Sequence, residues 1–237
     1  MRRSYVSLVL TALLVLATVG TALAGNPNPG VIPNTTKQYE QLSAKWWQWA
    51  FSFPRADIPF FNTGGPVDLS AGQSGNVWFL AGANNGLTQP RTGVVPTGTS
   101  LFFPLANLIN DYPCPSEYNF EPDPGETLEH FLQRTGEEFL DYYVPDSTTL
   151  FAEIDGVPLT DLSTYRATSS IFKFIADPAL ALDPVFDPCI TGSLQDGVAL
   201  GYWLLIPPLT PGVHTLHFGA PSMGQDITYE LTVTPGH

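Results

Sequence analysis

The stretch ITYELTVT, residues 227–234, alternates apolar and polar side chains without interruption. In an extended chain its isoleucine, tyrosine, leucine and valine fall on one side, and its threonines and glutamate fall on the other. A period of two residues is typical of a strand with one buried face and one face in water. The sequence therefore predicts a strand here, with its apolar side chains directed into a core.

Strand-like stretches recur through the rest of the chain. Residues 100–105 and 199–206 are apolar at consecutive positions, which suits strands buried on both faces. Asp155-Gly156 is a preferred residue pair for a type I′ turn, which predicts a hairpin. The further expected strands are 76–81, 148–154, 157–159, 165–170, 171–175 and 212–218. The fold class is therefore predicted to be mainly β: an antiparallel β-sandwich of jelly-roll or immunoglobulin-like type, with two amphipathic helices.

Two stretches have the period of an amphipathic helix. Between Thr36 and Pro54, apolar side chains that include Trp46 and Trp49 return every three or four positions, and the proline is expected to end the helix. A second helix is expected to begin with Asp123 as its N-cap and a proline at its first position. Its apolar face then runs on to residue 143.

The first 24 residues have the features of a signal peptide. Two arginines precede an uncharged apolar stretch, and Ala22-Leu23-Ala24 has the small residues that signal peptidase requires. An uncleaved membrane anchor is the alternative, which this cleavage pattern disfavours. We expect residues 1–24 to be removed, 25–35 to form a flexible leader and 36–237 to form a single domain. The expected location is secreted, periplasmic or cell-surface, with no membrane span after cleavage.

Composition excludes several classes of partner. The chain has 237 residues, a formal net charge of −13 and only 9 lysines and arginines, so nucleic acid and anionic membrane surfaces are not expected partners. Hydrophobic residues make up 43%, which is too much apolar surface for a disordered chain. The acidity is interpreted as a solubility device, with a cation or a basic partner as the alternative.

Cys114 and Cys189 are the two cysteines of the chain. In an oxidising compartment two cysteines most simply form one disulfide. A metal pair is the weaker alternative, because neither cysteine has a second cysteine or a histidine at ligand spacing. The sequence therefore predicts a Cys114–Cys189 bond that fastens the proline-rich loop at 111–125.

The cluster Trp46-Trp47-Gln48-Trp49 supplies the candidate binding residues. Trp47 lies about 100° from the apolar face of its helix, and an exposed indole beside Gln48 would suit stacking on a sugar ring. The loop at 55–75 that follows is long, and long loops often carry binding groups. Trp47, Gln48 and Arg91 are therefore the candidate ligand-binding residues. In the alternative interpretation the same loop covers Trp47.

The sequence lacks the common catalytic motifs. There is no HExxH, H-x-E or G-x-S-x-G motif, and His214 and His217 fall on opposite faces of one expected strand. Asp183 and Asp187 could hold Ca²⁺ from one loop, although a solvated acidic loop is the simpler interpretation. No catalytic residue, metal site or cofactor is predicted. Asn34 begins an Asn-Thr-Thr triplet that a eukaryotic secretory pathway could glycosylate.

Three blocks of sequence carry a resemblance. They are SAKWWQW at 43–49, GQxGxVWFLAG at 72–82, and Arg91 followed by VPxG at 95–98 and FFPLxN at 102–107. With these blocks the chain resembles a group of uncharacterised exported bacterial proteins, over residues 38–234. The resemblance implies that the proteins are related, and it does not imply any particular activity. It also implies cysteines near Asp68 and Val94, which this chain does not have. Arg91 is expected to pair with Asp57 or Asp68.

The functional expectation follows from the lack of catalytic motifs and from the aromatic content. We expect an exported, non-catalytic β-sandwich that binds a glycan or a surface partner, or serves as a structural envelope protein. The alternative is a carbohydrate-active hydrolase or lyase that uses paired carboxylates. Two carboxylates about 5 to 10 Å apart in an aromatic groove would favour the enzyme.

Overall fold

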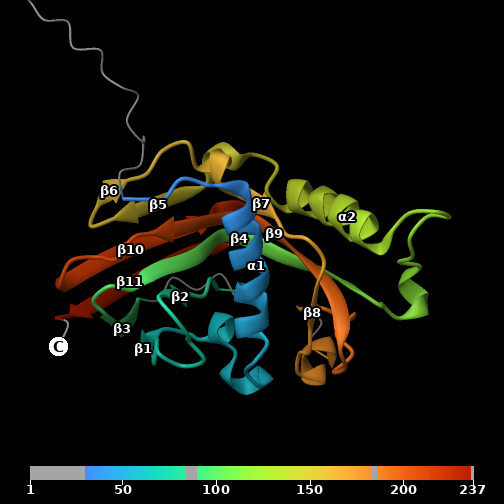
Figure 1. Ribbon diagram of the computed structural model, residues 1–237, viewed down its shortest axis with the longest axis horizontal. Helices are drawn as coiled ribbons and strands as arrows, with labels where there is room; N and C mark the ends of the chain where they lie inside the picture. Colours follow the sequence, from blue (N-terminus) through green and yellow to red (C-terminus); the bar gives the residue numbers. More distant parts are fainter. Residues whose placement is uncertain (1–29, 84–89, 183–185, 236–237) are drawn as a thin grey trace, which may run out of the picture.

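The computed structural model describes residues 30–83, 90–182 and 186–235, which form two β-sheets and two α-helices (Figure 1). The predicted class, a mainly β sandwich with two helices, is confirmed. The predicted signal peptide lies outside the described residues. Across the three described ranges, none of the helices combines the length and the apolar character needed to cross a membrane.

The first sheet has six strands, and the alternating stretch near the C-terminus forms one of its central strands. Strand β10 is antiparallel to both of its neighbours, whereas β3 is parallel to β1 and to β11. In spatial order the strands are β1 (Gly65–Pro66), β3 (Arg91–Pro96), β11 (Gln225–Thr234), β10 (Gly212–Ala220), β5 (Phe151–Ile154) and β6 (Val157–Pro158).

The second sheet is built on two long strands. Strand β4 is antiparallel to β9 along most of its length and parallel to the short strand β2. In spatial order the strands are β2 (Val77–Phe79), β4 (Ser100–Tyr112), β9 (Gln195–Ile206) and β7 (Arg166–Thr168), and β8 (Phe172–Phe174) also pairs with β9.

Both sheets are mixed, so the expectation of purely antiparallel sheets needs correction. The chain crosses from one sheet to the other between β1 and β2, and it crosses back between β2 and β3. A strand that returns to its sheet by such a crossover lies parallel to its neighbour, which accounts for the parallel pairs. Strand β3 is not among the strands expected from the sequence. Strand β4 continues to Tyr112, seven residues beyond its expected end at 105.

The seven short 3₁₀ helices of the described residues lie in the connections. They are η1 (Arg55–Asp57), η2 (Pro59–Phe61), η3 (Ser116–Tyr118), η4 (Ser147–Thr149), η5 (Leu162–Tyr165), η6 (Pro178–Leu182) and η7 (Pro221–Met223).

Strands β4 and β9 are covered on both faces, as their continuous apolar runs predict. On one face Trp203 of β9 contacts Trp46 of the helix α1 (Thr36–Ala50), with ring centroids 5.6 Å apart. On the other face Phe103 of β4 packs against Phe218 of β10 at 4.4 Å. Further along that second face, Leu200 lies against Gly136 of the helix α2 (Leu128–Tyr143). Figure 1 shows α1 in front of β4 and β9, with α2 farther along the same strands.

Helix α1 is held by indole hydrogen bonds as well as by burial. Trp46 Nε1 donates to Leu80 O at 2.8 Å, and Trp49 Nε1 donates to Ala71 O at 3.1 Å. The helix ends at Ala50, four residues before the expected proline, and Phe53 packs beside Trp49 from the following turn. The apolar face predicted from sequence therefore anchors the helix to the second sheet and to the loop after it.

Helix α2 begins later than predicted. Its N-cap is Thr127, whose hydroxyl accepts from His130 N at 3.3 Å. Asp123 is not the N-cap, because Gly125 has a φ of +89° and this left-handed conformation interrupts a helix. The Asp123 backbone N–H instead donates to Glu126 Oε2 at 3.2 Å.

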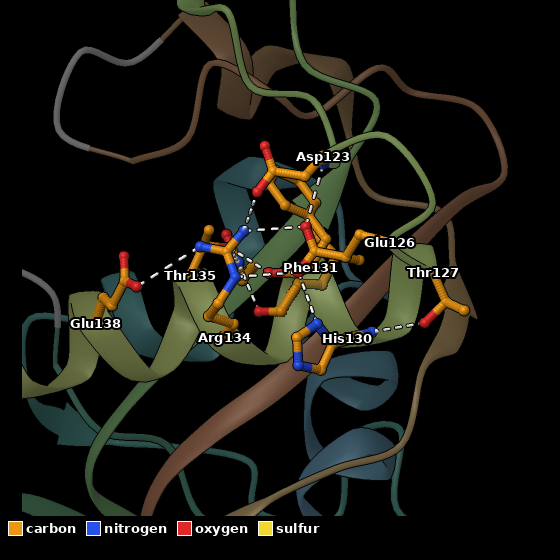
Figure 2. A network of polar contacts seen from close by, with 10 residues as sticks. Asp123, Glu126, Thr127, His130, Phe131, Arg134, Thr135 and Glu138 are labelled. Carbon is orange, nitrogen blue, oxygen red and sulfur yellow. Dashed lines mark hydrogen bonds and ion pairs between the residues drawn. The ribbon is translucent and has the colours of Figure 1, made fainter.

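A polar network fastens the start of α2 (Figure 2). Both carboxylate oxygens of Glu126 accept from Arg134 at 3.0 Å, and one of them lies 2.6 Å from His130 Nδ1. These bonds, with the bond to Arg134 as the largest cause, lower the pKa of Glu126 to about 2. Glu126 is therefore ionised at neutral pH, where a negative charge at a helix N-terminus is favourable.

Several shorter features agree with the sequence. Asp155 and Gly156 both have positive φ, as a type I′ turn requires, between β5 and β6. Cys114 and Cys189 form the predicted disulfide, which indicates an oxidising location. The leader differs from its prediction, because Val31 is buried and Ile32 N donates to Leu205 O at 2.7 Å.

Candidate binding site

The three candidate residues do not form one site. Arg91 is buried on β3, and its guanidinium donates to the carbonyls of Ala81, Gly82 and Asn62 and to the Tyr229 hydroxyl, at 2.9 to 3.0 Å. The expected ion pair with Asp57 or Asp68 is replaced by these neutral oxygens. Arg91 thus joins the two sheets and lines a pocket different from the one that Trp47 borders.

Gln48 and Trp47 point in different directions from α1. Gln48 is exposed, and its Nε2 donates to Lys173 O at 3.0 Å. Trp47 is only 4% exposed, and the rings of Phe51, Phe60 and Phe186 lie 5.1 to 6.4 Å from its ring. The alternative interpretation, in which the following loop covers Trp47, matches the contact with Phe60.

Trp47 nevertheless borders a pocket of about 400 Å³, which we call the Trp47 pocket. It lies beside the outer edge of β4, because β2 pairs only with residues 100–102 and leaves the later part of that edge without a described strand partner. Its aromatic and polar lining comes from α1, η2, β4, α2, the segment after residue 185 and β11. These lining residues are Trp46, Trp47, Phe60, Asn107, Tyr143, Phe186, Asp187 and Gln225.

Three polar atoms in this lining have no hydrogen-bond partner although they are buried. They are Nε1 of Trp47, Nδ2 of Asn107 and Oε1 of Gln225. A buried polar atom left unpaired costs about 1 to 3 kcal/mol, and most such atoms in folded proteins have a partner. Three of them around one pocket therefore indicate a place where a polar ligand could supply hydrogen bonds.

A pair of neighbouring aspartates adjoins the Trp47 pocket. Asp111, at the end of β4, is 2% exposed, and the half-buried Asp187 lines the pocket. Their carboxyls lie close to each other, Gln195 Nε2 donates to Asp111, and Cys189 N donates to Asp187 at 2.8 Å. Burial is the largest cause that raises the pKa of both carboxyls, and the neighbouring charge of Asp187 raises that of Asp111 further.

The two carboxyls lie close together beside the disulfide. One oxygen from each carboxyl and the Cys189 sulfur all lie within 4.8 Å of one another. The carboxyls of glycosidases are about 5 to 5.5 Å apart in retaining enzymes and about 6.5 to 9.5 Å apart in inverting ones. The two oxygens of Asp111 and Asp187 are therefore closer than the lower end of these separations. The sulfur belongs to the disulfide, so it is not available as a thiolate ligand.

The remaining candidates are structural. His214 Nδ1 lies 2.7 Å from Asp155 and His217 Nε2 lies 2.8 Å from Asp226, so the two histidines have separate partners. Burial opposes the charge of His214, but the bonds to Asp155 and to Thr210 O outweigh it and raise the pKa. The Nδ2 of Asn34 is bonded to two backbone carbonyls, and Asp183 lies outside the described residues.

Sequence reasoning found Trp47 but missed Asn107, Asp111 and Gln225. A signal was present in β4, where three polar residues interrupt the apolar run and two of them, Asn107 and Asp111, share one face. Gln225 carried no such signal, because it opens its strand beside a turn.

Comparison with known proteins adds little. No family model matches the chain, and no curated protein is similar to it at a significant level. One solved structure, described as "Structure of PbICP-C in complex with falcipain-2", aligns with 73% of this chain and 100% of that chain. The identity is 10% and the TM-score is 0.19, so this likeness carries no argument about fold or function.

Proposed function

We propose that this is an exported protein that binds a neutral carbohydrate in the Trp47 pocket. The observation that carries the proposal is the set of three unpaired buried polar atoms around an aromatic pocket. Binding sites for small ligands combine apolar and aromatic walls with a few polar groups that fix orientation. The disulfide supports the exported location.

The chemistry of the lining matches that of a sugar. Trp47 and Asn107 offer hydrogen-bond donors, and Gln225 offers an acceptor, while each sugar hydroxyl can act in both roles. The rings of Tyr143 and Phe186 line the pocket without being fully buried, so they suit the apolar face of a pyranose. A neutral sugar is favoured over an anionic one because Asp187 lines the pocket and the net charge is −13.

The test removes the unpaired side-chain oxygen of Gln225 while it keeps the volume of the side chain. Gln225→Met deletes the buried acceptor, so it should leave the thermal midpoint unchanged or raise it, because no internal hydrogen bond to that oxygen is lost. The same change should weaken sugar binding about tenfold, the effect of roughly 1.4 kcal/mol. Binding is first located on an array of neutral glycans and then measured by titration calorimetry.

Gln48→Ala is the matched control, since Gln48 is an exposed glutamine of the neighbouring helix outside the pocket. This control should bind as the parent protein does. Equal affinity of Gln225→Met and the parent would place binding elsewhere, and the absence of any glycan binding would contradict the proposal.

A further inference from the structure

A second pocket continues from the first along the edge of β4. This pocket of about 370 Å³, which we call the Tyr118 pocket, is lined by Tyr118, Phe120, Phe139 and Asp111. Both pockets are lined by the same five residues at their junction: Leu108, Ile109, Tyr143, Phe186 and Asp187. The two hollows are therefore halves of one groove, which follows β4 from Asn107 to Asp111.

From this continuity we infer that the ligand is an oligosaccharide of several units, which occupies both pockets at once. This inference rests on the proposed function. Four residue steps of a strand span roughly 13 Å at about 3.3 Å each, which is longer than one sugar ring.

The exposed aromatic rings of the Tyr118 pocket support an extended occupant. Tyr118 is 54% exposed and Phe139 is 46% exposed, so neither ring has the burial that would account for it as part of the core. Both rings border the groove, where the apolar faces of successive sugar units could cover them.

The carboxyl pair lies at the junction of the two pockets. Burial raises the pKa of both carboxyls, so the pair offers acceptor oxygens to the groove and carries less negative charge than two exposed aspartates would. Sugar hydroxyls can donate hydrogen bonds to these oxygens, whereas an anionic chain would be repelled by the remaining negative charge.

A peptide is the competing occupant, because the outer edge of β4 has no described strand partner beyond residue 102 and could pair with an added strand. The unpaired side-chain atoms favour the sugar. An added strand forms its hydrogen bonds with backbone groups, which would leave the side-chain atoms of Asn107 and Gln225 without partners.

The experiment is a chain-length series measured by titration calorimetry on the full mature protein. The probes are cello-, malto- and N-acetylated chito-oligosaccharides of one to six units. We expect affinity in one series to rise at least tenfold between one and four units. Phe139→Ala and Tyr118→Ala should each weaken binding of the tetrasaccharide at least fivefold and change that of the monosaccharide less than twofold.

Tyr142→Ala is the matched control, because Tyr142 is a more exposed aromatic residue of the same helix that lines neither pocket. It should leave all affinities unchanged. Equal affinity for one and four units would overturn the inference and leave the proposed function standing. Failure of every oligosaccharide to bind, or binding of extended peptides in their place, would overturn both.

Discussion

At the scale of single residues, this protein keeps several polar groups inside its core. The guanidinium of Arg91 donates its hydrogen bonds to neutral oxygens, whereas Asp111 and Asp187 lie together without a cation among their described contacts. Burying an unpaired charge is costly, and this cost raises the pKa of both carboxyls. Stability therefore depends on pH at this pair.

Asp111→Asn should make the protein more stable at neutral pH. The unfolded chain releases its aspartate protons near pH 4, whereas the folded pair holds its protons to higher pH because burial raises both pKa values. The free energy of unfolding of the parent should therefore fall as pH rises above about 4. The asparagine keeps an acceptor for Gln195 and gains a donor for Asp187. We expect a gain of about 1 to 2 kcal/mol at pH 7.

Urea unfolding at several pH values measures this effect. The difference between the variant and the parent should shrink as pH falls through about 4, because below that pH the pair is protonated in both states. A variant that is less stable than the parent at pH 7 would show that the aspartate is needed in its ionised form.

At the scale of elements, the two helices cover opposite faces of β4 and β9 and are fastened in different ways. Helix α1 relies on buried indoles and their hydrogen bonds to loop carbonyls. Helix α2 adds polar contacts to its apolar face, because Glu137 accepts from Arg166 and Thr168 of β7. Glu137 therefore joins helix and sheet, whereas the side chain of its neighbour Glu138 is exposed and pairs with Arg134.

Trp46→Ala should destabilise the protein strongly. The ring is 1% exposed, contacts Trp203 and Phe60, and donates from its indole nitrogen to Leu80 O. Loss of a buried tryptophan costs about 3 to 5 kcal/mol. At roughly 2 to 4 °C per kcal/mol, thermal unfolding followed by circular dichroism should show a midpoint lower by about 10 °C.

Gln48→Ala on the same helix should stay within about 0.5 kcal/mol of the parent, because Gln48 is exposed. A midpoint of Trp46→Ala within 2 °C of this control would mean that α1 is not part of the cooperative core.

At the scale of the whole molecule, the disulfide joins the end of β4 to the segment before β9. Its two cysteines are 75 residues apart in sequence. In the chain-entropy model, closing so long a loop stabilises the folded state by about 4 to 5 kcal/mol.

The double variant Cys114→Ser, Cys189→Ser should lose much of that stability in urea unfolding. The reduced parent protein should behave like the double variant, which separates the bond from the side-chain change. Mass spectrometry of non-reduced peptides provides the direct check, since free thiols at both positions in the parent would contradict the bond.

The sequence by itself determined the class of the fold and most of its elements. Alternation in residues 227–234 and the apolar runs at 100–105 and 199–206 reflect the burial of each strand face, and burial is encoded locally. The helix at Trp46 and the turn at Asp155 were predictable for the same reason. The pairing of two lone cysteines needed only an oxidising compartment.

The tertiary structure alone decided where the polar groups meet. Asn107, Asp187 and Gln225 lie far apart in sequence and come together only because β4, β9 and β11 belong to packed sheets. Parallel pairing at β3 depends on crossovers between sheets, which no local pattern records. A site is a set of distances between distant residues, so the pocket beside Trp47 had to be found in three dimensions.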